Sequence, residues 1–162
     1  MNQQRLMPME RTLRAPLERV WWRLTTQEGL ASWWGPEGFR SVVSHIDVRV
    51  GGGFEIAMTA ERPEIIAYLN STGVPVTSFD RGDYTDVHMQ QRLAWTGIVD
   101  FVPGVDSYGS STVVELTSLP DGGTRVLVYL TPMHDAHWTT MKTMGWEGQL
   151  KKLEELLLGE TP

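Results

Sequence analysis

Three side chains that can exchange protons lie close together in the sequence. Tyr84, Asp86 and His88 alternate along a strand-like stretch, residues 83–89, so they share one face of that strand. Facing a cavity, this trio would supply acid and base groups. No nucleophile or second carboxylate accompanies it, so an orienting role is favoured over catalysis. We expect Tyr84, His88 and Thr143 to give a bound molecule its polar contacts.

A second cluster, His134, Asp135 and His137, has the residue types that bind metal ions. The two histidines are three residues apart and would share a helix face, which allows both to reach one ion. A third ligand is not evident, and Asp135 also suits the N-cap of a following helix. We therefore predict no metal site and no cofactor.

Apolar and aromatic residues predict the walls of a small-molecule site, because such sites favour aromatic walls with few polar groups. An aromatic cluster follows two short helical segments, and further candidates have the parity of the inward face of strands. An alternative for the aromatic cluster is that it closes the core instead of lining a pocket. Met133, Met141 and Met144 would give the pocket an adaptable wall, and the alternative is that they fill the core. With the polar candidates above, the predicted cavity lining is Trp33, Trp34, Phe39, Phe54, Ile56, Met58, Tyr84, His88, Trp95, Phe101, Met141 and Thr143.

Composition excludes several classes of protein. The 162 residues contain no cysteine and carry a formal net charge of −6. Thiol catalysis, disulfides and cysteine-ligated metal sites are therefore excluded, and the acidic balance argues against nucleic-acid binding. No secretion signal or run of about 18 apolar residues occurs, which predicts a cytoplasmic protein without membrane insertion. The length suits one domain spanning residues 1–162.

The spacing of apolar residues predicts the elements that position these side chains. A short strand (7–13) precedes two short helices, the first beginning after Pro16 and the second capped by Thr26. Alternation then predicts about six antiparallel strands, in the first of which Val42, Ile46, Val48 and Val50 share one face. Residues 62–80 interrupt the sheet pattern, and we expect them to cover one entrance of a cavity. The last element is a helix over 137–158.

The final helix has an uneven apolar stripe. Trp146, Leu150, Leu153 and Leu157 are bulky, whereas the same stripe holds only small residues, Thr139 and Thr143, in the N-terminal half. A helix lying across a bent antiparallel sheet would leave a hollow at its small end. The expected fold is α+β, with a curved sheet gripping this helix.

Three motifs, taken together in this order, resemble those of one known family. They are Trp21-Trp22-Arg23-Leu24-Thr25 with Leu30-Ala31-Ser32-Trp33-Trp34-Gly35-Pro36, then Val50-Gly51-Gly52-Gly53-Phe54, and finally Gly145-Trp146-Glu147-Gly148-Gln149-Leu150-Lys151-Lys152-Leu153. The chain resembles the activator of Hsp90 ATPase homologue 1-like family, within the START-like (Bet v 1-like, SRPBCC) superfamily. This resemblance implies a helix-grip fold of seven antiparallel strands around the C-terminal helix, with an apolar cavity between them.

Three functions follow from the residues and the resemblance. The leading prediction is a non-enzymatic protein that binds a small hydrophobic or amphipathic molecule in the cavity. The alternatives are a chaperone-associated or stress-response adaptor, and an enzyme that uses the cavity. Two or more titratable groups converging inside the pocket would favour the enzyme. A homodimer is compatible with the free edges of the sheet.

Overall fold

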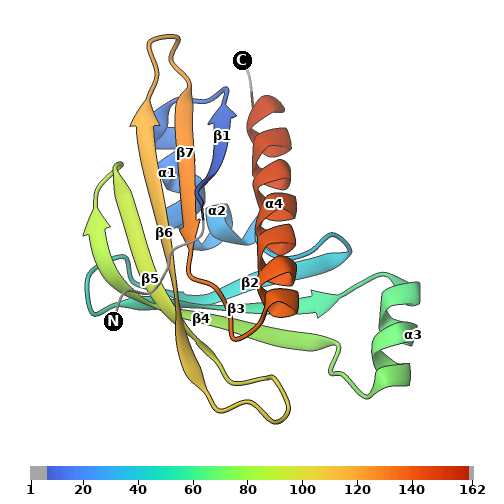
Figure 1. Ribbon diagram of the computed structural model, residues 1–162. Coiled ribbons are helices and arrows are strands. Elements are labelled where there is room, and N and C mark those ends of the chain that lie inside the picture. Colours follow the sequence, from blue (N-terminus) through green and yellow to red (C-terminus); the bar gives the residue numbers. More distant parts are fainter. Residues whose placement is uncertain (1–6, 161–162) are drawn as a thin grey trace.

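The seven strands in the described part of the chain join one sheet. The computed structural model describes residues 7–160. Its elements are β1 (Met9–Leu13), α1 (Leu17–Thr25), α2 (Gln27–Ala31), β2 (Phe39–Ile46), β3 (Gly53–Ala60), α3 (Pro63–Thr72), β4 (Thr77–His88), β5 (Arg92–Val99), β6 (Tyr108–Ser118), β7 (Thr124–Leu130) and α4 (Ala136–Leu158). The sheet is antiparallel throughout, in the order β1-β7-β6-β5-β4-β3-β2. It bends around α4, which confirms the predicted α+β helix-grip fold (Figure 1).

The predicted helix starts are confirmed by their capping groups. Pro16 is the N-cap of α1, and its carbonyl accepts the N–H of Arg19 and of Val20. The Thr26 hydroxyl accepts the Gly29 N–H at 3.0 Å at the start of α2. At the start of α4, the Asp135 carboxylate accepts the Trp138 N–H at 2.8 Å. The Thr26 and Asp135 side chains each satisfy a backbone donor that has no partner inside the helix, whereas Pro16 makes no side-chain cap hydrogen bond.

The predicted parity of β2 is wrong at Val42 but right at Ile46, which packs against the core. Val43 is buried, whereas Val42 is 49% exposed, because the pairing register between β2 and β3 shifts between Val43 and His45. Such a bulge inserts an extra residue and reverses which side chains face the core. The strand also ends at Ile46, so Val48 and Val50 lie in the following loop.

Residues 62–80 form a helix and the beginning of a strand. Helix α3 starts at Pro63 and ends before Gly73, which has a φ of +74°. None of its residues is buried, and Figure 1 shows it projecting beside the ends of β3 and β4. Strand β4 begins at Thr77, six residues earlier than predicted, so it includes Asp80.

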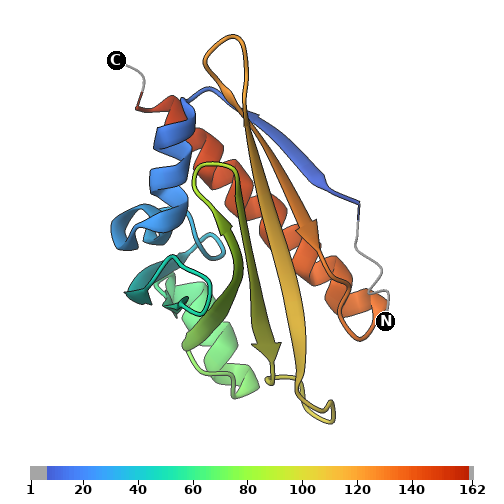
Figure 2. The same cartoon turned by 90° about the vertical axis from the view of Figure 1, so that its left-hand side faces the viewer.

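The core lies between α4 and the concave face of the sheet. The C-terminal half of α4 buries Leu150, Leu153 and Leu157, and α1 lies beside this end of the helix (Figure 2). Gly82 on β4 leaves room for an aromatic ring, because a Cβ there would stand 2.5 Å from Phe54 Cε1. None of the helices in residues 7–160 combines the length and the hydropathy that crossing a membrane requires.

Candidate functional site

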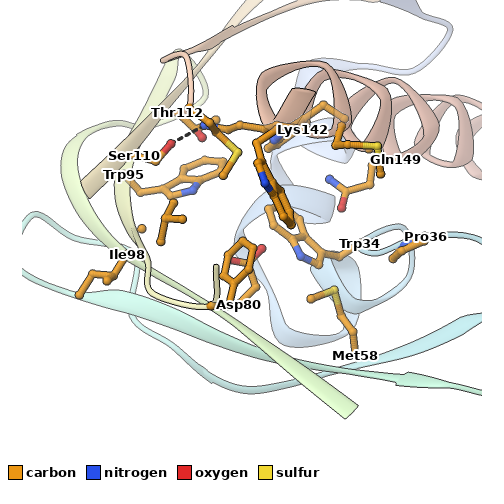
Figure 3. A pocket seen from close by; sticks show the side chains of 18 residues that line it. Trp34, Pro36, Met58, Asp80, Trp95, Ile98, Ser110, Thr112, Lys142 and Gln149 are labelled. Carbon is orange, nitrogen blue, oxygen red and sulfur yellow. Dashed lines mark hydrogen bonds between the residues drawn. The ribbon is translucent and has the colours of Figure 1, made fainter. Parts of the chain in front are cut away.

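A pocket of about 420 Å³ lies under the N-terminal half of α4. Its wall is mostly aromatic and aliphatic, with a small polar group of side chains from β4, β6 and α4 (Figure 3). Three large apolar lining residues are exposed, Ile98, Phe101 and Met141, and they mark the mouth of the pocket. The Phe101 and Trp138 rings contact each other edge to face at 5.6 Å between centroids. The pocket therefore opens to solvent between α4 and the end of β5.

The predicted cavity lining divides into two sets. Five of the predicted residues line the pocket: Trp34, Met58, Trp95, Phe101 and Met141. The other seven do not: Trp33, Phe39, Phe54, Ile56, Tyr84, His88 and Thr143. Trp33, Phe54, Ile56 and Tyr84 are buried in the core, and Phe54 packs against Trp34 and Trp95 behind the pocket wall. The hypothesis of core packing therefore describes these four.

The hollow lies at the N-terminal half of α4, as the small residues of the stripe predict. It lies, however, against a different face of the helix. Met141, Lys142 and Gly145 line the pocket, while Thr139 and Thr143 do not. The Thr143 hydroxyl donates to the Thr139 carbonyl at 2.9 Å, within the helix itself. Gly145 leaves open space on this side of α4, because a Cβ built there would meet no atom within 4 Å.

The two clusters of titratable residues predicted from the sequence lie away from the pocket. Tyr84 is buried and points to the core, whereas the side chain of His88 is 62% exposed and pairs with Asp86 at 2.9 Å. A register shift in β4 between Tyr84 and Asp86 separates the trio. His134 Nδ1 hydrogen-bonds with the hydroxyl of Tyr108 at 2.6 Å, and Asp135 caps α4. In the part of the chain that the structure describes, no three such side chains form a metal-binding group.

Lys142 is one of two ionisable residues that line the pocket. Its Nζ donates to the Ser110 hydroxyl at 2.5 Å and to the Thr131 carbonyl at 3.3 Å. Burial lowers the pKa of Lys142 to about 8, and the nearby Asp80 carboxylate only partly opposes this shift. About one tenth of this amine is therefore neutral at pH 7, and the rest is charged.

Asp80 is the other ionisable residue of the pocket, and it comes from β4, across the pocket from α4 (Figure 3). Burial raises the pKa of Asp80 to about 6, while the Trp34 indole, Lys142 and the Arg81 backbone favour the charged form. Within residues 7–160, Asp80 and Lys142 do not form a direct ion pair. Each group therefore presents hydrogen-bonding capacity to the space between them.

Trp34 adds a hydrogen-bond donor to this polar end. The residue is 4% exposed, and its Nε1 has no hydrogen-bond partner of normal geometry in the described residues. The indole still interacts with the Asp80 carboxylate, whose pKa it lowers, and a ligand oxygen beside Asp80 would give its N–H an acceptor of better geometry.

The sequence-based prediction did not include Asp80 or Lys142, although helical spacing indicates the position of Lys142. Lys142 stands four residues before Trp146 and seven before Gln149, both buried, so helical spacing places it on the pocket face. Asp80 has the same parity in β4 as Gly82 and Tyr84, which are buried. The sequence hides this parity, because Pro63, Gly73 and Pro75 interrupt the alternation just before Asp80.

Comparison with known proteins agrees with the fold and the motifs. The family model described as "Activator of Hsp90 ATPase homolog 1-like protein" matches residues 14–158. The chain belongs to this family. No curated protein matches the chain.

Solved structures of similar proteins come from several bacteria. A protein from Chromobacterium violaceum is 25% identical, with a TM-score of 0.72 over 94% of this chain and 96% of that one. One from Nitrosomonas europaea is 27% identical, with a TM-score of 0.70 over 99% and 97%. An AHSA1-like protein from Aeromonas hydrophila is 21% identical, with a TM-score of 0.73 over 96% and 93%. Members of the Hsp90 ATPase activator-like family share the START-like fold, which commonly binds ligands.

Proposed function

We propose that this protein binds a small amphipathic molecule in the pocket under α4. The pocket itself carries the proposal: its walls are mainly apolar, and two ionisable side chains, Asp80 and Lys142, face its interior. Transfer of apolar ligand surface from water to these walls would contribute roughly 25 cal/mol per Å². The polar group of the ligand would lie between Asp80 and Lys142 and fix its orientation.

The polar end suits an oxygen-containing group. Lys142 and the Trp34 indole, which has no hydrogen-bond partner of normal geometry, are donors, while the Asp80 carboxylate is an acceptor. A hydroxyl both accepts and donates, so it can satisfy both sides at once, and a carbonyl can accept from the donors. The ring faces of Trp95, Trp138 and Trp146 suit a planar, apolar body.

A simple aromatic alcohol tests the proposal. We expect 2-naphthalenemethanol to change the tryptophan fluorescence saturably and to raise the melting temperature, because it binds the folded state. Native mass spectrometry should show one molecule bound per chain. Failure of this alcohol, and of a wider panel of lipids, aromatic compounds and polyketides, to stabilise the protein would contradict the proposal.

Substitution Gly145→Leu is predicted to fill the pocket from α4. The new side chain would occupy the open space at Gly145, so the affinity for 2-naphthalenemethanol should fall by at least about tenfold. Stability should not fall, because leucine has a higher helix propensity than glycine, by about 0.8 kcal/mol. Fluorescence titration measures the affinity, and urea denaturation measures the stability.

Gly148→Leu is the matched control. Gly148 is also exposed on α4 with no atom within 4 Å of its Cβ position, but it does not line the pocket. This variant should gain similar helix stability and bind the alcohol as the unmodified protein does. Equal loss of affinity in both variants would place the ligand elsewhere.

The chaperone-associated role and the homodimer stay predictions from the sequence. The first would be tested by a pull-down with the Hsp90 of the same host, and the second by the mass of the protein in solution.

A further inference from the structure

The lysines of this chain differ sharply in their surroundings. There are three, Lys142, Lys151 and Lys152. Lys151 is exposed, and Lys152 donates to the Gly35 carbonyl at 3.2 Å outside the pocket lining. Lys142 alone among them lines the pocket. A reactive amine in an apolar pocket is an arrangement that suits covalent capture of a carbonyl group.

The hydrogen bonds of Lys142 fit a neutral amine. A neutral amine has two hydrogens, and the Ser110 hydroxyl and the Thr131 carbonyl provide two acceptors. Within residues 7–160, the third hydrogen of a charged ammonium would have no acceptor in the protein, and no ion pair forms with Asp80. When both hydrogens are held in this way, the nitrogen lone pair is free to meet a ligand. The lowered pKa of Lys142 is consistent with this state.

We propose that Lys142 binds the aldehyde or ketone group of an aromatic ligand as a Schiff base, with Asp80 as the proton donor. This proposal rests on the proposed function, because it requires the ligand to occupy the pocket. It adds the chemical class of the ligand's polar group and a covalent step.

The step balances with the groups present. The Lys142 nitrogen attacks the carbonyl carbon, the C–O π pair moves to oxygen, and one amine proton passes to that oxygen to give a neutral carbinolamine. The Asp80 carboxylic acid then protonates the hydroxyl, the C–O bond breaks, and water leaves. The nitrogen lone pair forms the C=N bond of an iminium ion, and Asp80 is left as a carboxylate. No oxidant or reductant is needed.

The surroundings of Asp80 suit the role of acid. The ionisable groups that line the pocket are Asp80 on β4 and Lys142 on α4, and the neighbouring polar groups are Trp34, Ser110, Thr112 and Gln149. A carboxyl with a pKa of about 6 keeps a useful fraction of acid near neutral pH. Once formed, the iminium cation would face the Asp80 carboxylate in an apolar pocket, where opposite charges attract strongly.

Reductive trapping with a matched pair of ligands tests the proposal. The full chain is incubated with 2-naphthaldehyde and sodium cyanoborohydride, which reduces an iminium ion to a stable secondary amine. Peptide mass spectrometry then compares the three lysines. We expect one naphthylmethyl group per chain on Lys142, added at least about tenfold faster than on Lys151. An excess of 2-naphthalenemethanol, which lacks the carbonyl, should suppress labelling of Lys142 but not of Lys151.

Substitutions at Lys142 and Asp80 test the role of the amine and the role of the acid separately. Lys142→Arg and Lys142→Met should give no adduct in the pocket at an aldehyde concentration that saturates each variant. Asp80→Asn should slow the labelling of Lys142 at pH 7 by about tenfold or more when the aldehyde concentration saturates the variant. Between pH 6 and 8 the labelling rate of the unmodified protein should stay nearly level, because the loss of Asp80 acid offsets the gain of neutral Lys142, whereas the rate of Asp80→Asn should rise with pH.

The outcomes are distinguishable. If the alcohol binds but the three lysines are labelled at equal rates, the Schiff base is excluded and the proposed function stands. If neither the alcohol nor the aldehyde binds, both proposals fail. Labelling of Lys142 that is insensitive to the alcohol would also overturn the inference, because the reaction would then not require the pocket.

Discussion

Trp146→Ala is expected to lower the free energy of unfolding by about 3–5 kcal/mol, the range for removing a buried aromatic side chain. Trp146 is 7% exposed and joins the core to the pocket wall. Its ring centroid lies 5.4 Å from that of Trp34 and 6.1 Å from those of Trp33 and Trp95. Removing the ring leaves these neighbours without a packing partner, and urea denaturation measures the loss.

Trp22→Ala is the control for this variant. Trp22 is half-buried on α1 and lies below the guanidinium groups of Arg19 and Arg23. Its removal should cost about 1 kcal/mol, mainly through the loss of cation–π contacts. A similar loss for both variants would mean that Trp146 is not a centre of the core.

Asp80→Asn is expected to stabilise the protein at pH 7 by about 2 kcal/mol, although it removes a charge opposite to that of Lys142. The folded state holds the Asp80 proton more tightly than the unfolded state, since the pKa rises from 3.8 to about 6. Stability is therefore lost as the pH rises through this window. Asparagine has a similar shape and no charge to desolvate, so the loss should disappear.

The pH dependence provides the check. The stability difference between Asp80→Asn and the unmodified protein should be small near pH 4, grow until about pH 6, and then level off. Asp86→Asn, which removes a carboxylate paired with Arg92 at 2.7 Å, should instead lower stability by up to about 1 kcal/mol. A destabilised Asp80→Asn at pH 7 would show that Asp80 is a net stabilising partner of Lys142 rather than a strained functional group.

Lys142 changes the stability of the protein in a higher pH range than Asp80 does. Its pKa is lowered from 10.5 to about 8, so the folded state binds this proton less tightly than the unfolded state. The contribution of Lys142 therefore becomes more favourable as the pH rises from 8 to 10.5. Between pH 6 and 8 both groups are largely charged, and the pocket is then at its least stable. Such a sacrifice of stability is typical of functional sites.

Much of the fold could be predicted from the sequence because periodicity and capping act locally. Pro16, Thr26 and Asp135 mark helix starts whether or not the rest of the chain is known. The side chains of β2 that face the core could not all be predicted in this way, since one bulge after Val43 reverses the alternation of buried and exposed side chains. A bulge depends on pairing with β3, which alternation along one strand does not report.

The position of the pocket could be predicted, but its polar residues could not. Bulky and small residues on α4 locate the hollow along the helix. The face of α4 that lines the hollow could not be predicted in the same way. Neighbouring residues differ by about 100° around the helix axis, so a stripe drawn through Thr143 misses Lys142 and Gly145. Asp80 reaches the pocket only because β4 extends back to Thr77. The pair therefore forms through tertiary structure alone.

The indole N–H signals of the seven tryptophans give the most direct test of a ligand-binding pocket under α4. Four line the pocket, Trp34, Trp95, Trp138 and Trp146, whereas Trp21 and Trp22 lie on α1. In a two-dimensional ¹H–¹⁵N spectrum titrated with 2-naphthalenemethanol, we predict saturable shifts for these four and none for Trp21 and Trp22. Shifts confined to Trp21 and Trp22, or no saturable shift for any of the four, would contradict the account.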